Sequence, residues 1–135
     1  MRTSFPFISQ QQAIALLRIG VALVFFLHAF VRILNGTIPE FASFFNEKGF
    51  VYGRALVWAI TAFEIAGSVL LAINYRSKCI SAIFIFILVA GIILIHAKLG
   101  WFVGEHGTGG VEYSFALILA LLVIAAGDTE RTRLL

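Results

Sequence analysis

Four stretches of this sequence are apolar enough and long enough to cross a lipid bilayer, and five ionisable residues interrupt them. The stretches cover about 12–34, 52–73, 79–98 and 110–126, each roughly 25–35 Å as a helix. The interrupting residues are Arg18, His28, Glu64, His96 and Glu112. A charge at the bilayer centre costs at least ~2.5–3.5 kcal/mol, so such residues usually face a bundle interior or a wet cavity. The sequence therefore predicts an all-α membrane protein, a four-transmembrane-helix bundle with polar groups inside it.

Composition supports a lipid-facing exterior and a single domain. Of the 135 residues, 61% are hydrophobic and the mean hydropathy is +1.00, more than a water-soluble core of this size would hide. The net charge of +3 comes from basic residues at the ends of the predicted spans, where they typically set topology and contact anionic lipid. We therefore expect one transmembrane domain, 1–135, with membrane lipid as a partner and no nucleic-acid binding.

The ends of the chain and the loops predict how it is oriented. The first apolar stretch is similar to a secretory signal, but Arg18 interrupts it and no small-x-small cleavage pattern follows, so we expect a retained first helix. Basic residues gather in the two tails and the second loop, at Arg2, Arg76, Lys78, Arg131 and Arg133. This bias predicts both termini in the cytoplasm and, as the expected location, a bacterial inner membrane.

Cys79 is the single cysteine of the chain. An intrachain disulfide therefore cannot form, and no Cys-x-x-Cys pair is present to act as a dithiol relay. A reduced structural thiol in the second loop is the simplest interpretation.

A short amphipathic helix is predicted between the first two spans. Thr37 and Glu40 have the spacing of a capping box, and Gly49 is suited to ending the helix. Phe41, Phe44 and Phe45 then share one face, which is typical of a helix lying in the membrane interface. These phenylalanines either pack over the bundle or cover a site as a lid.

Depth along the helices predicts a structural ion pair between Arg18 and Glu64. Arg18 lies roughly 10 Å and Glu64 roughly 13 Å from the cytoplasmic ends of adjacent antiparallel spans. A guanidinium and a carboxylate at similar depth would neutralise each other. The alternative is that Arg18 extends to the lipid headgroups and Glu64 stays protonated.

A second group of polar residues falls toward the outer face and predicts a pocket there. His28 and Arg32 share a face of the first span, while His96 and Glu112 lie near the outer ends of the third and fourth spans. In this hypothesis His28, His96 and Glu112 are the catalytic, proton-exchanging residues. The ligand-binding residues are Arg32, Arg54, Trp101, Glu105 and His106. For each residue a structural role stays open, as a helix–helix hydrogen-bond partner or a member of an interfacial aromatic belt.

A metal site is not expected from this group. Two histidines and one carboxylate are the donors of one common iron site, but no helix here has a His-x-x-x-His or Glu-x-x-His pair. The sequence encodes no flavin, haem or iron–sulfur motif either.

Several short motifs occur in a fixed order along the chain. They are Leu16-Leu17-Arg18-Ile19 with Gly20, Phe25-Phe26-Leu27-His28, Phe63-Glu64-Ile65-Ala66-Gly67, His96 with Gly100-Trp101-Phe102, Gly110-Val111-Glu112-Tyr113 and Gly127-Asp128. In this order they resemble the DoxX family of small four-helix membrane proteins over nearly the whole chain. Ala29 and Arg32 stand where that family often has glycine and lysine, so a small residue and a base are kept.

The resemblance implies membrane-associated redox work. Relatives are similar to a subunit of thiosulfate:quinone oxidoreductases or act with soluble redox enzymes, while distant members act as assembly chaperones, so the family limits function only loosely. We therefore expect a membrane component of a quinone-linked or thiol/sulfur redox complex, with an outer pocket for a quinone headgroup or a small anion and a protein partner that supplies electrons. Whether such a component is itself catalytic stays open. The alternatives are a non-enzymatic scaffold or assembly factor, and a small-solute transporter acting as a homo-oligomer.

Overall fold

The computed structural model describes residues 4–104 and 109–133, the last five of these for their backbone alone, and these parts contain helices and no strand. The helices are α1 (Gln10–Leu34), α2 (Ile38–Glu47), α3 (Gly53–Ala72), α4 (Ser77–Leu94), the short 3-10 helix η1 (His96–Leu99) and α5 (Glu112–Arg133). The predicted all-α class is therefore confirmed, and so is a helix between the first two spans.

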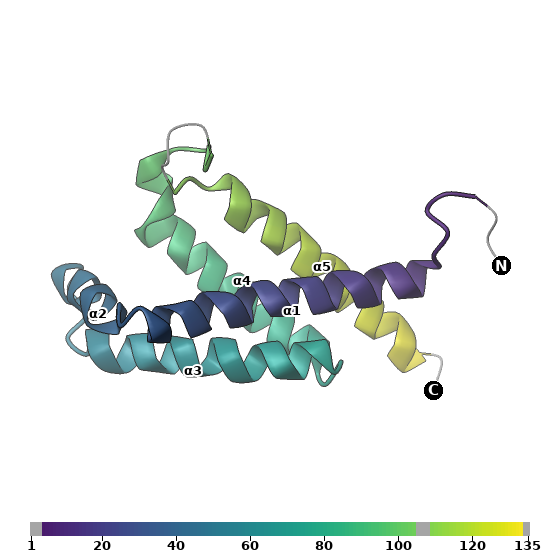
Figure 1. The fold of residues 1–135 in the computed structure, drawn as a ribbon, viewed down its shortest axis with the longest axis horizontal. Helices are drawn as coiled ribbons and strands as arrows, with labels where there is room; N and C mark the ends of the chain where they lie inside the picture. Colours follow the sequence, from purple (N-terminus) through teal and green to yellow (C-terminus); the bar gives the residue numbers. More distant parts are fainter. Residues whose placement is uncertain (1–3, 105–108, 134–135) are drawn as a thin grey trace.

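Figure 1 shows two groups of helices. The helices α1 and α3 run side by side, and α2 lies across the end where they connect. The second group, α4 and α5, packs against the first at one end of the molecule and diverges from it toward the other end. Both chain termini lie at the end where the groups meet, opposite α2 and η1.

Three helices, α1, α3 and α4, are long and apolar enough to cross a membrane. They correspond to the first three predicted spans. The third ends at Leu94 instead of residue 98, because the chain turns into η1 at His96. A fourth span in α5, and an interfacial position for α2, stay predictions.

The helix ends show which sequence signals operate. At α1, the Ser9 side chain accepts from the Gln12 backbone N–H and the Gln12 side chain accepts from the Ser9 backbone, forming a capping box. The capping box predicted at Thr37 is wrong, because its hydroxyl donates back to the Arg32 carbonyl and makes no cap bond. Gly49 does end α2, with a φ of +95° that suits glycine.

The closed end of the molecule is held by an apolar core that all four long helices share. Its buried members are Val21, Ala22, Phe25, Leu71, Ile80, Phe84, Leu121 and Ile124. At its centre Phe84 stacks on Phe25 with ring centroids 4.0 Å apart and meets Phe63 edge-on at 5.2 Å. Stacking of this kind adds roughly 0.5–1.5 kcal/mol per pair beyond area burial, so this trio fastens α4 to the α1–α3 pair.

A second, smaller cluster joins α2 to α3. Its buried residues are Ile38, Ala42, Phe45 and Val57. The Asn46 side chain accepts a hydrogen bond from the Gly53 backbone N–H at 3.0 Å, which ties the end of α2 to the start of α3. The helix α2 therefore lies on the first turns of α3 instead of standing apart from the bundle.

Candidate functional site

A cavity of about 1030 Å³ lies between the two helix groups, at the end where they diverge. All five α-helices and η1 contribute to its wall, which is mostly apolar and aromatic. The polar side chains on this wall are His28, Arg32, Asn35, Thr37, Glu64, His96, Tyr113 and Ser114. A large apolar pocket with a few convergent polar groups is the usual form of a small-molecule site.

The strongest polar feature of the wall is a buried ion pair between α1 and α3. Arg32 Nη1 lies 2.7 Å from Glu64 Oε2 and donates a second bond to the Thr61 hydroxyl at 2.7 Å. Both charged side chains are nearly fully buried, at 9% and 5% exposed. The Phe41 ring of α2 lies over the guanidinium, with Cζ 5.2 Å from the ring centroid, in a cation–π contact.

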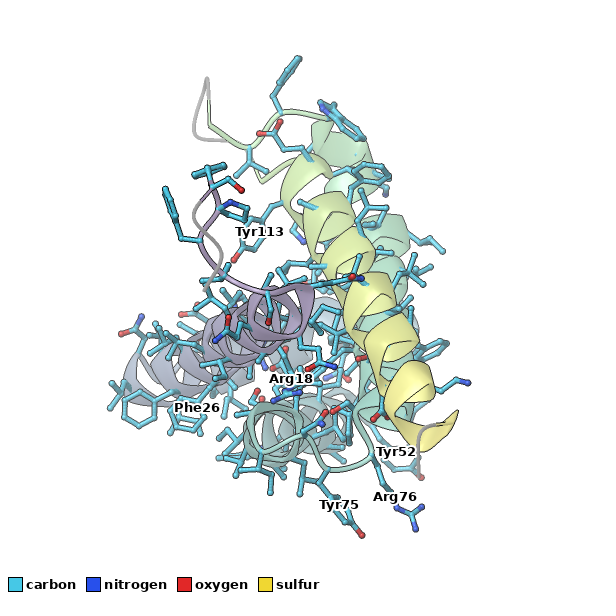
Figure 2. The ribbon with its side chains drawn as sticks, turned by 90° about the vertical axis from the view of Figure 1, so that its right-hand side faces the viewer. Arg18, Phe26, Tyr52, Tyr75, Arg76 and Tyr113 are labelled. Atoms are coloured by element: carbon cyan, nitrogen blue, oxygen red, sulfur yellow. The ribbon has the colours of Figure 1, made fainter. Side chains whose placement is uncertain are left out.

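The predicted pairing of Glu64 with Arg18 is therefore wrong, since Glu64 is paired with Arg32. The depth estimate assumed that the cytoplasmic ends of the two helices, the start of α1 and the end of α3, lie at the same level. In the structure Arg32, near the end of α1, contacts Glu64 in the middle of α3, whose first turns α2 covers. In Figure 2, viewed along α1, the Arg18 side chain lies between α1 and α3, and along α1 it is nearly four turns from Arg32.

Two of the predicted catalytic residues, His28 and His96, reach the cavity. His28 lies one turn before Arg32 on α1, and both residues line the wall as their spacing predicted. His96 begins η1, and its Nδ1 lies 2.6 Å from the Gly109 carbonyl oxygen. Because a carbonyl only accepts, Nδ1 carries a proton, and in the neutral form of the ring Nε2 is the acceptor.

Glu112 and Trp101 instead hold the chain between η1 and α5. The Glu112 carboxylate accepts from the Val103 backbone N–H at 2.9 Å, and the Glu112 N–H donates to the Trp101 carbonyl at 3.0 Å. The Trp101 ring packs on Phe115 at 5.4 Å between centroids. Neither Glu112 nor Trp101 lines the cavity.

Of the other predicted ligand-binding residues that the structure describes, Arg54 does not line the cavity. Arg54 is exposed at the start of α3 and lines a separate, shallow pocket of about 460 Å³ beside Trp58. Glu105 and His106 lie outside the described residues. No three His, Cys, Asp or Glu side chains converge anywhere in 4–104 and 109–128.

Two lysines lie close together where the end of α2 approaches η1. Lys48 caps α2, and Lys98 lies in η1. Lys98 lowers the pKa of Lys48, first through a side-chain hydrogen bond and then through its like charge. Neither lysine lines the cavity.

Some residues of the site carried no recognisable signal in the sequence. Thr61, which is not a wall residue but accepts a hydrogen bond from Arg32, lies in an apolar run, and its role follows from the α1–α3 register. Tyr113 and Ser114 lie in the first turn of α5, and Figure 2 shows Tyr113 projecting from α5 on the side of α1. The only sequence feature near Tyr113 and Ser114 was Glu112, and its carboxylate was predicted as the functional group in place of these two side chains.

The helices and this cavity define a polytopic, helical membrane protein with a largely apolar cavity that carries a few polar side chains. Comparison with known families narrows the class. A family model described as DoxX matches residues 13–97, more than half of the chain, so the protein belongs to the DoxX family. No curated protein and no solved structure matches the chain.

Proposed function

We propose that this protein is the membrane-embedded, ligand-binding component of a redox complex, and that a quinone binds in the cavity between the two helix groups. The observation that supports this most is the wall itself. It is largely apolar, as an isoprenoid tail requires, and its few polar groups include Arg32 on α1, Glu64 on α3 and His96 in η1. A bound quinone would supply electron and proton exchange, with electrons coming from a protein partner.

The residues present fit such a ligand. Phenylalanine side chains from three helices, among them Phe25, Phe41 and Phe86, give flat apolar surfaces for a ring and tail. Arg32 offers N–H donors, and His96 offers a ring nitrogen acceptor at Nε2. A quinone headgroup has carbonyl groups when oxidised and hydroxyl groups when reduced. The cavity wall offers a hydrogen-bond donor for the first and an acceptor for the second.

His96 is suited to holding a proton in this site. When Nε2 gains a proton, Nδ1–H keeps its bond to the Gly109 carbonyl, so the ring need not turn. The imidazole therefore changes charge without losing its anchor, and this is the requirement for a group that exchanges a proton with a bound ligand.

Direct binding tests this proposal. The purified protein in phosphatidylcholine nanodiscs is incubated with decylubiquinone, and the bound quinone is measured against empty nanodiscs. We expect Gly91→Leu to weaken binding by about tenfold or more, since Gly91 lines the cavity and a Cβ there has one neighbour within 4 Å, His96 Cδ2 at 3.9 Å. The added Cβ therefore meets no clash, and we expect the rest of the leucine side chain to occupy ligand volume.

Gly20→Leu is the matched control. Gly20 is exposed on α1, lies outside the cavity wall, and has no atom within 4 Å of an added Cβ. Binding by this variant should equal that of the unaltered protein. Equal binding by Gly91→Leu, or no binding above empty nanodiscs by the unaltered protein, contradicts the proposal and favours a scaffold without a ligand.

We further propose that α5 is the fourth span and that the cavity opens on the outer side of a bacterial inner membrane. An even number of spans agrees with both termini lying at one end of the molecule. The basic loops then place that end in the cytoplasm.

A further inference from the structure

The cavity contains an ion pair whose hydrogen-bonding capacity is only partly used. Arg32 donates through Nη1 alone, to Glu64 and Thr61, in the described part of the chain. Its Nε and Nη2 are neither bonded to another described group nor among the described buried atoms, and the Arg32 side chain lines the cavity. The ion pair is monodentate, and Glu64 Oε1 likewise has no partner among the described residues and is not sealed from the cavity.

The charges around these free donors limit the ligand they accept. The Glu64 carboxylate lies 2.7 Å from the guanidinium, so the pair presents no net charge to a bound group. An anion that approached Arg32 would also approach this carboxylate in a low-dielectric site, where repulsion is strong. A neutral carbonyl oxygen accepts a bond from Arg32 without that repulsion.

We infer that the Arg32–Glu64 pair makes the cavity selective for an uncharged, carbonyl-bearing amphiphile, such as the oxidised headgroup of a quinone, and against anions. This inference rests on the proposed function and chooses between its two ligand classes. Arg32 is the residue that binds the carbonyl oxygen. Glu64 is a positioning residue that orients the guanidinium and excludes anions through its charge.

The position of the pair supports this assignment. Thr61 and Phe41 hold the guanidinium from two further directions, so its orientation is determined before a ligand arrives. Thr61 donates its own hydroxyl hydrogen to the Val57 carbonyl at 2.8 Å, which leaves its oxygen to accept from Arg32. A preorganised donor of this kind favours one acceptor geometry at little entropic cost.

The test compares two probes with the same ten-carbon tail, neutral decylubiquinone and anionic decyl sulfate, in phosphatidylcholine nanodiscs. The unaltered protein should bind decylubiquinone and should bind decyl sulfate at least about tenfold more weakly. Glu64→Gln keeps an acceptor for Arg32 but removes the negative charge. It should gain about tenfold or more in affinity for decyl sulfate and change little toward decylubiquinone.

Glu40→Gln is the matched control, since Glu40 is an exposed carboxylate on α2 outside the cavity wall. It makes the same change in net charge and should leave both affinities unaltered. Tight decyl sulfate binding by the unaltered protein would overturn the inference but leave the proposed quinone binding intact. A Glu64→Gln variant that folds and keeps the selectivity of the unaltered protein would overturn the inference in the same way. If decylubiquinone does not bind at all, the proposed function fails and the inference with it. Selectivity of the unaltered protein decides the question even where Glu64→Gln does not fold.

Discussion

At the residue scale, the structure separates ionisable residues that hold the bundle together from those that face the cavity, and Arg32 belongs to both groups. It joins α1 to α3 through Glu64 and Thr61, and it also lines the cavity. A buried ion pair is weak evidence for stability by itself, because desolvation offsets much of the Coulomb attraction. Removal of one partner is different, because the other charge is then left buried alone.

We expect Arg32→Met to lower the free energy of unfolding by about 3–5 kcal/mol, since Glu64 would remain buried without its cation. The double variant Arg32→Met/Glu64→Met removes both charges and should recover much of that loss. Denaturation in mixed micelles, followed by circular dichroism, measures both values.

Arg54→Met provides the control, because Arg54 is exposed at the start of α3. Its unfolding free energy should stay within about 0.5 kcal/mol of the unaltered protein. A double variant that is as unstable as Arg32→Met would show that the pair stabilises the fold beyond charge compensation, contrary to our expectation.

At the element scale, the position of α2 determines the register of α1 against α3. The sequence predicted α2 from its phenylalanine spacing and from Gly49, and the helix is present at Ile38–Glu47. Its contact with the first turns of α3 was not predicted, because it depends on the absence of a side chain at Gly53. A Cβ at Gly53 would collide with the Ala42 carbonyl oxygen and with Asn46.

Gly53→Ala should therefore destabilise the protein by about 1–3 kcal/mol, since a backbone carbonyl cannot move aside as a flexible side chain can. Thermal unfolding in detergent measures the effect. In Gly20→Ala, the new methyl group meets no atom within 4 Å, and the variant should be as stable as the unaltered protein or slightly more stable. Equal stability of the two variants would mean that α2 does not pack on α3 this closely.

At the scale of the whole molecule, an apolar core closes one end and a cavity opens the other. The aromatic trio around Phe84 marks the boundary, since Phe25 belongs to the core and also lines the cavity. The composition predicted an apolar, lipid-facing exterior, because the bilayer requires one. The sequence could not predict that α4 and α5 diverge from α1, because apolar residues that face lipid and apolar residues that face a cavity are alike in sequence.

The orientation of the whole chain can be tested with its single cysteine. Cys79 is exposed in the first turn of α4, at the end that carries both termini. We propose, from the basic loops, that this end lies in the cytoplasm. A membrane-impermeant maleimide should then label Cys79 in inverted vesicles and not in intact spheroplasts.

The control variant Cys79→Ser/Ser43→Cys carries the cysteine on α2, where Ser43 is exposed. It should show the opposite labelling pattern. A reporter fused to the C-terminus should be active in the cytoplasm if α5 crosses the membrane, and a periplasmic signal from it would contradict a fourth span.

The sequence by itself determined that this protein is a membrane protein, that it is helical, where its first three spans begin and end to within a few residues, and which family it belongs to. These follow from local properties, since hydropathy, helix length and short motifs need no knowledge of distant residues. Only the tertiary structure decided that Glu64 pairs with Arg32, that His28 and His96 share a cavity wall, and that Glu112 binds a backbone N–H instead. Those outcomes depend on the relative shift of whole helices, which close packing at Gly53 and stacking at Phe84 establish between segments far apart in the chain.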